Sequence, residues 1–497
     1  MTKIGIKDLL NNNLKKWGNR NFIYTKVNNE FVPKTFEKTI NDTFSLAAYL
    51  LHIGLEKKHI LIYGENSYEW IISDLASMYV GVAVSANKEW REKDLENIIK
   101  IADVECIIYS NNNETVVNNI KEKFNIKCIS MQNDLPKLIE EGSKLLEKKS
   151  EKFKEKNREE MCKIVFTSGT TSNSKAVMLS EKNLFAGFES LSKRAPMGTS
   201  DKIYLFLPLN HTYSGIYNLL AALYFGMELY LCSDTNKIIE ELQIVKPTIF
   251  CAVPLIYERI YSMLGETVIK EVQINKNKKY LKQVKDIFGG DIKYLFCGGA
   301  KYSSDIRKFY KDAELKMLEA YALTETASSL SIEYADSKNV SSVGTIFEDI
   351  DVKFIDIDEN GYGEILVKGD NVALGYYKNE IETKKAFDTD GYFHTGDIGY
   401  KDSKNQLFLM GRKRRMIVFS NGENIYPDEI EDLFANIEGI NKVKVFENSN
   451  KILATIFVKN NEIDVEKIVN AINESLPKYK RITSYDIVID SIDKRMK

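Results

Sequence analysis

A run of small and hydroxylated residues ends in a lysine and follows a short apolar segment, residues 161–166 (MCKIVF), that is expected to be a strand. The run consists of Thr167, Ser168, Gly169, Thr170, Thr171, Ser172, Asn173, Ser174 and Lys175. Backbone N–H groups and hydroxyls in such a loop can surround an anion, and the lysine adds a full positive charge. The run lacks the second glycine of a Walker loop, and it lacks the Ser or Thr after the lysine. A phosphate-binding loop and a polar surface loop are both open at this point.

Four further segments follow this run along the chain. They are Gly298-Gly299-Ala300, Tyr321-Ala322-Leu323-Thr324-Glu325, residues 391–397 ending in Asp397, and residues 411–414 with Arg412 and Arg414. A hard cation that bridges phosphates prefers carboxylate oxygens, which suits Glu325. Alternatively, Glu325 has only a structural role, as an acidic residue at the start of a short helix.

In this order along the chain, the segments resemble the motifs of the acyl-adenylate-forming superfamily, which includes acyl-CoA synthetases, luciferases and the adenylation domains of peptide synthetases. TSGTT with Lys175 resembles the phosphate-binding loop, YALTE the YGxTE motif, and GYFHTGD the GWxxTGD segment. NGENIYP and the residues up to 431 match the loop and helix that follow. The resemblance covers essentially the whole chain. GENSYEWIISDLA, KPTIFCAVPLIYERIY and LPLNHT look most like long-chain fatty acyl-CoA synthetases.

The resemblance implies a role for each of these positions. Nucleotide binding is implied for Thr167, Ser168, Gly169, Thr170, Thr171, Gly298, Gly299, Ala300, Tyr321, Asp397 and Arg412. Lys175 would hold the departing pyrophosphate, Thr324 would contact the α-phosphate, and Glu325 would bind Mg²⁺. Tyr321 would stack on the adenine, and Asp397 would accept hydrogen bonds from both ribose hydroxyls.

Residues near the C-terminus would take part in a domain rotation. Arg414 is the expected hinge. The loop expected to reach the site for the thiol step consists of Ser420, Asn421, Gly422 and Glu423. A catalytic lysine that bridges the carboxylate and the α-phosphate is expected near the end of the chain, where Lys494 and Lys497 are the candidates. His211 would line the acyl pocket, but a lone histidine in an apolar setting is as often structural.

The implied reaction is ATP-dependent activation of a carboxylic acid, expected to be a fatty acid, to acyl-AMP, followed by transfer to coenzyme A. Mg²⁺, ATP and CoA are the expected cofactor and substrates. Two alternatives stay open: transfer to a carrier-protein thiol, and nucleotide binding without turnover. The second alternative is favoured by Ser172, Ser174 and Ala176, which replace Gly, Pro and Gly of the superfamily loop, and by the lack of a terminal Gly-Lys pair.

Composition and residue spacing exclude several classes of binding partner for this chain. Lys and Arg total 69 against 71 Asp and Glu, and the net charge of −2 argues against a dedicated nucleic-acid binder. No CxxC pair or HExxH spacing points to a zinc site. Residues 203–227 lack formal charge but include Pro208 and Asn210, so we expect soluble core there and no membrane span. Without a signal peptide at its start, the protein is expected in the cytoplasm with small-molecule partners, and a homodimer and peripheral membrane contact stay open.

Alternating strands and helices must position these segments. Apolar strands are expected at residues 59–63, 106–109, 161–166, 248–253 and 292–297. Helical patterns separate them, which favours βαβ units and parallel sheets. Later, Asn360-Gly361 predicts a hairpin between residues 351–357 and 364–368. Residues 427–476 predict the order helix, strand, strand, helix, with Leu433 on the apolar face of the first helix.

We therefore expect an α/β fold in two domains. Residues 1–411 would form a large N-terminal part with mostly parallel βαβ sheets and a small β-barrel-like unit. Residues 412–497 would form a small, mobile α+β C-terminal domain.

Overall fold

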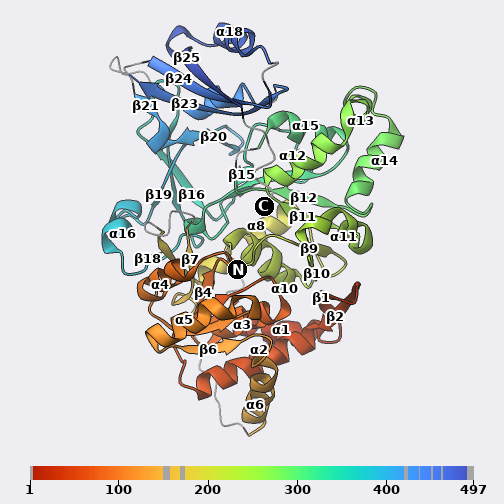
Figure 1. Cartoon of the computed structure of the whole chain (residues 1–497), viewed down its shortest axis with the longest axis vertical. Coiled ribbons are helices and arrows are strands. Elements are labelled where there is room, and N and C mark those ends of the chain that lie inside the picture. The colour runs from red at the N-terminus through yellow and green to blue at the C-terminus, as the bar shows by residue number, and fades with distance from the viewer. Residues whose placement is uncertain are drawn as a thin grey trace.

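The computed structural model describes residues 4–148, 157–167, 174–300, 302–418, 424–435, 437–448, 451–460 and 463–489. Two large mixed sheets carry most of the helices, and a small antiparallel sheet and a C-terminal α+β unit follow them (Figure 1). The C-terminal unit lies at the opposite end of the long axis from the N-terminal helices (Figure 1).

The first large sheet has seven strands and is parallel over five of them. In spatial order they are β18 (Gly375–Tyr376), β8 (Ala176–Ser180), β7 (Met161–Phe166), β4 (Val82–Ala86), β3 (His59–Tyr63), β5 (Val104–Tyr109) and β6 (Lys127–Ser130). The helices of this part are α1 (Ile6–Trp17), α2 (Phe36–His52), α3 (Tyr68–Val80), α4 (Glu92–Ile101), α5 (Glu114–Phe124) and α6 (Leu135–Glu147). Every residue of β3 and β4 is buried, as expected for central strands of a parallel sheet between helices.

The second large sheet has nine strands, with β13 to β1 parallel and both edges antiparallel. In spatial order they are β15 (Thr345–Ile346), β14 (Ser331–Ile332), β13 (Met317–Tyr321), β12 (Tyr294–Cys297), β11 (Ile249–Ala252), β9 (Lys202–Leu205), β10 (Glu228–Leu231), β1 (Asn21–Val27) and β2 (Glu30–Thr35). The helices between residues 181 and 312 are α7 (Glu181–Phe185), α8 (Phe188–Arg194), α9 (Thr212–Ser214), α10 (Ala221–Phe225), α11 (Ile238–Val245), α12 (Pro254–Met263), α13 (Gly265–Gln273), α14 (Lys278–Ile287) and α15 (Ser304–Asp312).

The uncharged stretch 203–227 forms a strand, a polar loop and helical turns. β9 leads into α9, a π-helical segment at Gly215–Leu220 follows, and α10 ends the stretch. Among the described residues, no helix combines the length and the apolar character that a bilayer crossing requires.

Each large sheet includes strands from a distant part of the chain. β1 lies in parallel next to β10, with Ile23 opposite Leu229, although the strands of this sheet other than β1 and β2 begin at residue 202. β18 lies antiparallel to β8, with Tyr376 opposite Val177. One continuous hydrophobic core contains side chains from both sheets. The two sheets are therefore parts of one folded body.

The smaller β unit is an antiparallel sheet of β16 (Asp351–Ile355), β17 (Gly363–Lys368), β19 (Phe393–Lys401) and β20 (Leu407–Arg412). The predicted hairpin is confirmed, since Asp351 stands opposite Lys368. Its connection is longer than a two-residue turn, and Gly361 adopts a φ of +82° within it. In place of the expected barrel-like closure, the described strands form an open sheet with β16 and β20 at its edges.

The C-terminal unit begins with the predicted helix, strands and helix, which are α17 (Pro427–Asp432), β23 (Ile440–Asn448), β24 (Lys451–Val458) and α18 (Val465–Ser475). The Asp464 side chain caps α18 by accepting a hydrogen bond from the Lys467 N–H at 3.0 Å. The prediction missed a further strand, β25 (Ile482–Ile489), which pairs in parallel with β24. It was also wrong about Leu433, which is 43% exposed because α17 ends one residue before it.

Candidate active site

Asp397 is the centre of a cluster contributed by three strands, in which Asp397 and Tyr321 are buried and Arg412 is exposed. Tyr321, the last residue of β13, donates its hydroxyl to Oδ2 of Asp397. Arg412, the last residue of β20, places Nε 2.7 Å from Oδ1. Asp397 and Arg412 stand opposite each other in the β19–β20 ladder. Strand register thus brings together three of the residues that the sequence predicted to bind nucleotide.

The electrostatics of this cluster extend to the predicted metal ligand. Burial raises the pKa of Asp397, Arg412 and Tyr321 act against that rise, and the carboxylates of Asp428 and Glu325 add to it. Burial and the Asp397 carboxylate raise the pKa of Tyr321 far above its usual value, so the phenol remains protonated and acts as the donor. Because the Glu325 charge acts on Asp397, the predicted metal ligand and ribose ligand share one electrostatic environment.

Tyr376 lies between Glu325 and Lys175 and contacts both of them. Glu325 lies in the short 3-10 turn Thr324–Thr326 after β13, and its Oε1 accepts a hydrogen bond of 2.8 Å from the Tyr376 hydroxyl. The Lys175 ammonium lies 4.6 Å from the centroid of the same ring. Lys175 Nζ also lies 2.8 Å from Oε2 of Glu382, in α16 (Glu380–Ala386). The sequence predicted Lys175, Thr324 and Glu325 as catalytic residues but missed Tyr376 and Glu382.

The two ends of the predicted phosphate loop are held together. The Thr167 N–H donates to the Lys175 carbonyl at 3.1 Å, and the Lys175 N–H donates to Oγ1 of Thr167 at 3.3 Å. Several predicted site residues lie outside the described residues, namely Ser168, Gly169, Thr170, Thr171, Ser420, Asn421, Gly422, Glu423, Lys494 and Lys497. Their roles remain predictions.

The Gly298-Gly299-Ala300 turn lies beside the strand that carries Tyr321. A Cβ on Gly298 would come 3.2 Å from the carbonyl oxygen of Ala320, and Gly299 adopts a φ of +85° that side-chain-bearing residues rarely adopt. Gly299 and Ala300 are exposed. The turn can therefore present backbone to a planar ligand next to Tyr321.

His211 has a structural role in the local fold. Its Nδ1 accepts a hydrogen bond of 3.2 Å from the Tyr213 N–H, which caps the start of α9. Partial desolvation of the imidazole lowers its pKa, although part of the residue is exposed. This capping bond explains why a histidine is accommodated here, and the acyl-pocket role remains a prediction.

The predicted hinge lies between two residues that contact different parts of the protein. Lys413 Nζ lies 2.8 Å from Asp356 and 2.7 Å from Glu364, both in the small antiparallel sheet and its hairpin. Arg415 pairs with Asp428 and Glu431 of α17 in the C-terminal unit. Arg414 between them is exposed. β20 ends at Arg412, so the expected domain boundary after residue 411 falls at the last residue of that strand.

The arrangement around Glu325 suits a metal ion whose ligands come mainly from a bound phosphorylated substrate. Within the described part of the chain, no group of three or more His, Cys, Asp or Glu side chains could hold a metal ion. Mg²⁺ commonly takes one or two protein carboxylates and completes its shell with substrate phosphates and water. Glu325, fixed through one oxygen by Tyr376, fits that pattern.

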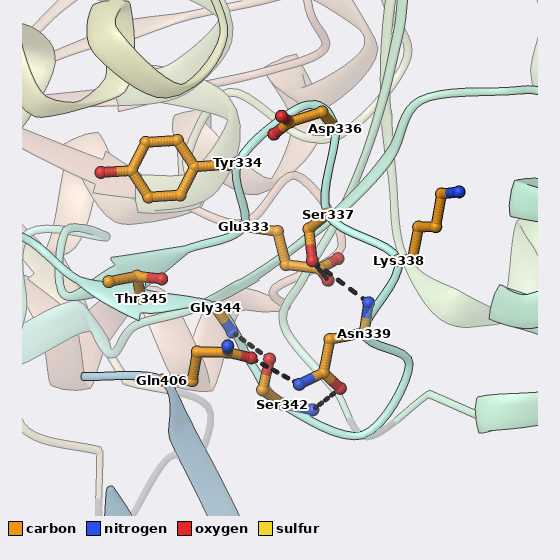
Figure 2. Close-up of a pocket in the computed structure, with 10 residues that line it drawn as sticks. All are labelled: Glu333, Tyr334, Asp336, Ser337, Lys338, Asn339, Ser342, Gly344, Thr345 and Gln406. Carbon is orange, nitrogen blue, oxygen red and sulfur yellow. Dashed lines mark hydrogen bonds between the residues drawn. The ribbon is translucent and has the colours of Figure 1, made fainter. Parts of the chain in front are cut away.

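A separate pocket of about 500 Å³ opens at the β14–β15 edge of the nine-stranded sheet (Figure 2). It is lined by Glu333, Tyr334, Asp336, Ser337, Lys338, Asn339, Ser342, Gly344, Thr345 and Gln406. Figure 2 shows that several of these groups bond to one another: Asn339 donates to Gln406 and accepts from the Ser342 N–H. None of the residues predicted to bind nucleotide lines this pocket.

Curated relatives of the chain are named as fatty acyl-CoA synthetases. Fatty acyl-CoA synthetase A of Dictyostelium discoideum is 24% identical over 477 residues, which are 85% of this chain and 71% of the relative. Long chain acyl-CoA synthetase 3 of Arabidopsis thaliana is 27% identical over 88% of this chain and 75% of the relative. Peroxisomal long chain acyl-CoA synthetase 6 of the same plant is 27% identical over 82% of this chain, which spans only 65% of that relative.

Solved structures share the fold at low sequence identity. ATP-bound MatB from Rhodopseudomonas palustris aligns with a TM-score of 0.83 at 21% identity, over 98% of this chain and 95% of that chain. A Mycobacterium tuberculosis fatty acyl CoA synthetase aligns with a TM-score of 0.71 at 20% identity, over 98% and 94%. These alignments confirm the predicted fold class. The family described as AMP-binding enzyme matches residues 11–377, a range that holds Lys175, Tyr321 and Glu325, and the chain is therefore a member of the AMP-binding enzyme family.

Proposed function

We propose that the chain is an AMP-forming acyl-CoA synthetase that activates a fatty acid. The observation that carries this proposal is that Asp397 contacts Tyr321 and Arg412, while Tyr376 contacts both Glu325 and Lys175. A ligand with a ribose at one end and phosphates at the other would engage both groups. The names of the curated relatives support a fatty acid as substrate and CoA as acceptor.

In the first half-reaction, a carboxylate oxygen of the acid forms a bond to the α-phosphorus of ATP. The bond from that phosphorus to the bridging oxygen breaks, and pyrophosphate leaves. This step depends on positioning and charge neutralisation more than on proton transfer. Lys175 would balance the charge of the departing pyrophosphate, and Thr324 would contact the α-phosphate. A magnesium ion at Glu325 would supply further charge neutralisation when bound.

In the second half-reaction, the CoA thiol loses its proton to solvent and its sulfur attacks the acyl carbon, the bond from that carbon to the phosphate oxygen breaks, and AMP leaves. We expect residues 412–497 to rotate about Arg414 between the two steps. The contacts of Lys413 and Arg415 with different parts of the protein support a hinge at this position. The rotation would exchange a terminal lysine, Lys494 or Lys497, for the loop that contains Gly422.

Exchange of labelled pyrophosphate into ATP tests the proposal. We expect exchange that requires an added fatty acid, and thioester formation that requires CoA. Exchange without thioester, restored by a carrier protein, would favour the carrier-thiol alternative. No exchange with any acid across a chain-length series, from a protein that still binds ATP, would favour nucleotide binding without turnover. Omission of the acid is the control for exchange that does not depend on acid activation.

Three finer features also belong to the proposal. We expect Mg²⁺ to be required, and chelation followed by Mg²⁺ addition tests this requirement. We expect the protein in the cytoplasm, which fractionation of the source cells tests. A homodimer and peripheral membrane contact are tested by light scattering and by co-sedimentation with vesicles.

A further inference from the structure

Tyr376 occupies the space between the two charged groups that the proposed reaction uses. Its hydroxyl donates a hydrogen bond of 2.8 Å to Oε1 of Glu325, and its ring centroid lies 4.6 Å from Nζ of Lys175. The residue is only 4% exposed. A buried phenol that contacts a carboxylate with its hydroxyl and an ammonium with its ring connects the two groups sterically and electrostatically.

The backbone fixes Tyr376 in register with Lys175. Strand β8 begins directly after Lys175, and β18 pairs with it so that Tyr376 stands opposite Val177. The Tyr376 N–H donates to Oγ1 of Thr383 at 2.9 Å, which ties the strand to α16. Figure 1 shows β18 and α16 side by side, next to the strands of the seven-stranded sheet. The position of the ring therefore depends on strand pairing and not on the Lys175 contact alone.

The next residue, Tyr377, points to a different partner. Its hydroxyl donates to Oδ2 of Asp103 at 2.8 Å, and Lys378 pairs with the same carboxylate at 2.6 Å. Successive side chains of a strand point to opposite faces. Tyr377 therefore anchors the strand edge away from the site, while Tyr376 faces Glu325.

The hydrogen bond between Tyr376 and Glu325 has a fixed direction. The phenol hydroxyl is the donor and the carboxylate oxygen is the acceptor. A donor to one carboxylate oxygen restricts rotation of the carboxyl group. The second oxygen of Glu325 is then held in a fixed direction, which is the requirement for coordinating a cation.

We infer that Tyr376 is a positioning residue that aligns Glu325 for the metal and Lys175 for the phosphates of the same nucleotide. This inference rests on the proposed use of Mg·ATP. The hydroxyl acts on the metal through Glu325, and the ring acts on the phosphates through Lys175. The two effects can be separated, because phenylalanine removes the first and leucine removes both.

Calorimetric titration tests the inference without turnover, since no fatty acid is present. Tyr376→Phe should bind Mg·ATP about tenfold more weakly, the loss expected for a hydrogen bond to a charged group. It should bind AMP, and ATP in excess chelator, as the wild type does. Tyr376→Leu should also weaken ATP in chelator, because Lys175 loses the ring. Tyr377→Phe is the matched control, which loses a neighbouring hydroxyl–carboxylate bond and should leave all three affinities unchanged.

Other outcomes would contradict the role of Tyr376, the proposed function, or both. If Tyr376→Phe binds Mg·ATP as tightly as the wild type, the hydroxyl does not position the metal ligand and the inference is wrong. Equal losses for Mg·ATP and AMP would make Tyr376 a general structural residue, which also overturns it. A wild-type protein that binds no Mg·ATP overturns this inference together with the proposed function. If the wild type binds Mg·ATP but forms no thioester, the proposed function fails, and the variant comparison still decides the role of Tyr376.

Discussion

Asp397 is held in a state that favours ligand binding over stability. Burial raises its pKa, so the folded protein binds the proton more tightly than the unfolded chain does. The contribution of this group to stability is therefore fully present at low pH and is lost as the pH rises through the raised pKa. At neutral pH the buried, charged carboxylate lowers the free energy of unfolding. In return, its oxygens are available to accept hydrogen bonds from ribose hydroxyls.

Asp397→Asn should separate these two effects. We expect AMP affinity to fall by about 1–3 kcal/mol, because the ribose hydroxyls lose a charged acceptor. The melting temperature should not fall, since a buried charge has been removed. In calorimetry, wild-type AMP affinity should decrease on acidification at a higher pH than an ordinary aspartate would predict, whereas the variant should not follow this dependence. Unchanged AMP affinity in the folded variant would exclude Asp397 from the site.

Glu325→Gln tests the metal ligand itself. The amide keeps an oxygen that can accept from Tyr376 but removes the charge that attracts Mg²⁺. We expect slower pyrophosphate exchange that is partly restored by raised Mg²⁺, because a weaker site still fills at higher concentration. Exchange assays at a series of Mg²⁺ concentrations measure this shift. If the variant and wild-type curves coincide, Glu325 is structural.

At the scale of elements, α16 brings a competing carboxylate to the phosphate lysine. Glu382 pairs with both Lys175 and Lys385, and these two ammonium groups lower its pKa to about 2. The Lys175 and Glu382 side chains are about one-third exposed, so the pair is worth only about 0–1 kcal/mol. Triphosphate can therefore displace Glu382 from Lys175 at low cost, and Lys385 remains to balance the released carboxylate.

Glu382→Gln should consequently strengthen ATP binding, by about two- to fivefold, since that range corresponds to the energy of an exposed pair. Glu380→Gln is the control on the same helix, because Glu380 is exposed and lies near Lys384 and not near Lys175. Titration of ATP into both variants at low and high salt measures the effect. Weaker binding by Glu382→Gln would mean that the carboxylate holds Lys175 in a productive position.

The elements that could be predicted from the sequence are those whose apolar pattern indicates that they are buried. β3, β7, β11 and β12 were found because each is a short run of mostly apolar residues, and the structure buries most of them. β25 was missed because only Ile482 in it is buried, which leaves no alternation to detect. β18 has two residues, and only its pairing with β8 makes it a strand.

The same reasoning explains which residues of the candidate site could be predicted from the sequence. Tyr321, Asp397 and Arg412 lie in segments that resemble family motifs, and the structure brings their side chains into contact. Tyr376 contacts a carboxylate that lies 51 residues away, so no local spacing could indicate it. Residues that act through tertiary contacts need the three-dimensional arrangement before their roles can be inferred.

At the scale of the whole molecule, a rotation about Arg414 would separate the two half-reactions. Replacing both Lys494 and Lys497 by Ala should reduce pyrophosphate exchange about 10²-fold or more, because a positioned cation is lost from the developing phosphate charge. Thioester formation from supplied acyl-AMP should be largely retained. Replacing Gly422 by a bulky residue should give the reverse pattern. Full exchange activity in the double variant would show that neither lysine bridges the carboxylate and phosphate.

The exchange of strands between the two large sheets constrains the order in which the chain can fold. During synthesis, β1 and β2 emerge first, but the edge of β1 finds its partner only after residues 228–231 have left the ribosome. The seven-stranded sheet likewise waits for β18 before its β8 edge is covered. Contacts this distant in sequence slow folding and expose strand edges to aggregation. A nascent chain stopped before residue 228 should therefore remain protease-sensitive in its first hairpin and become resistant only when β10 is available.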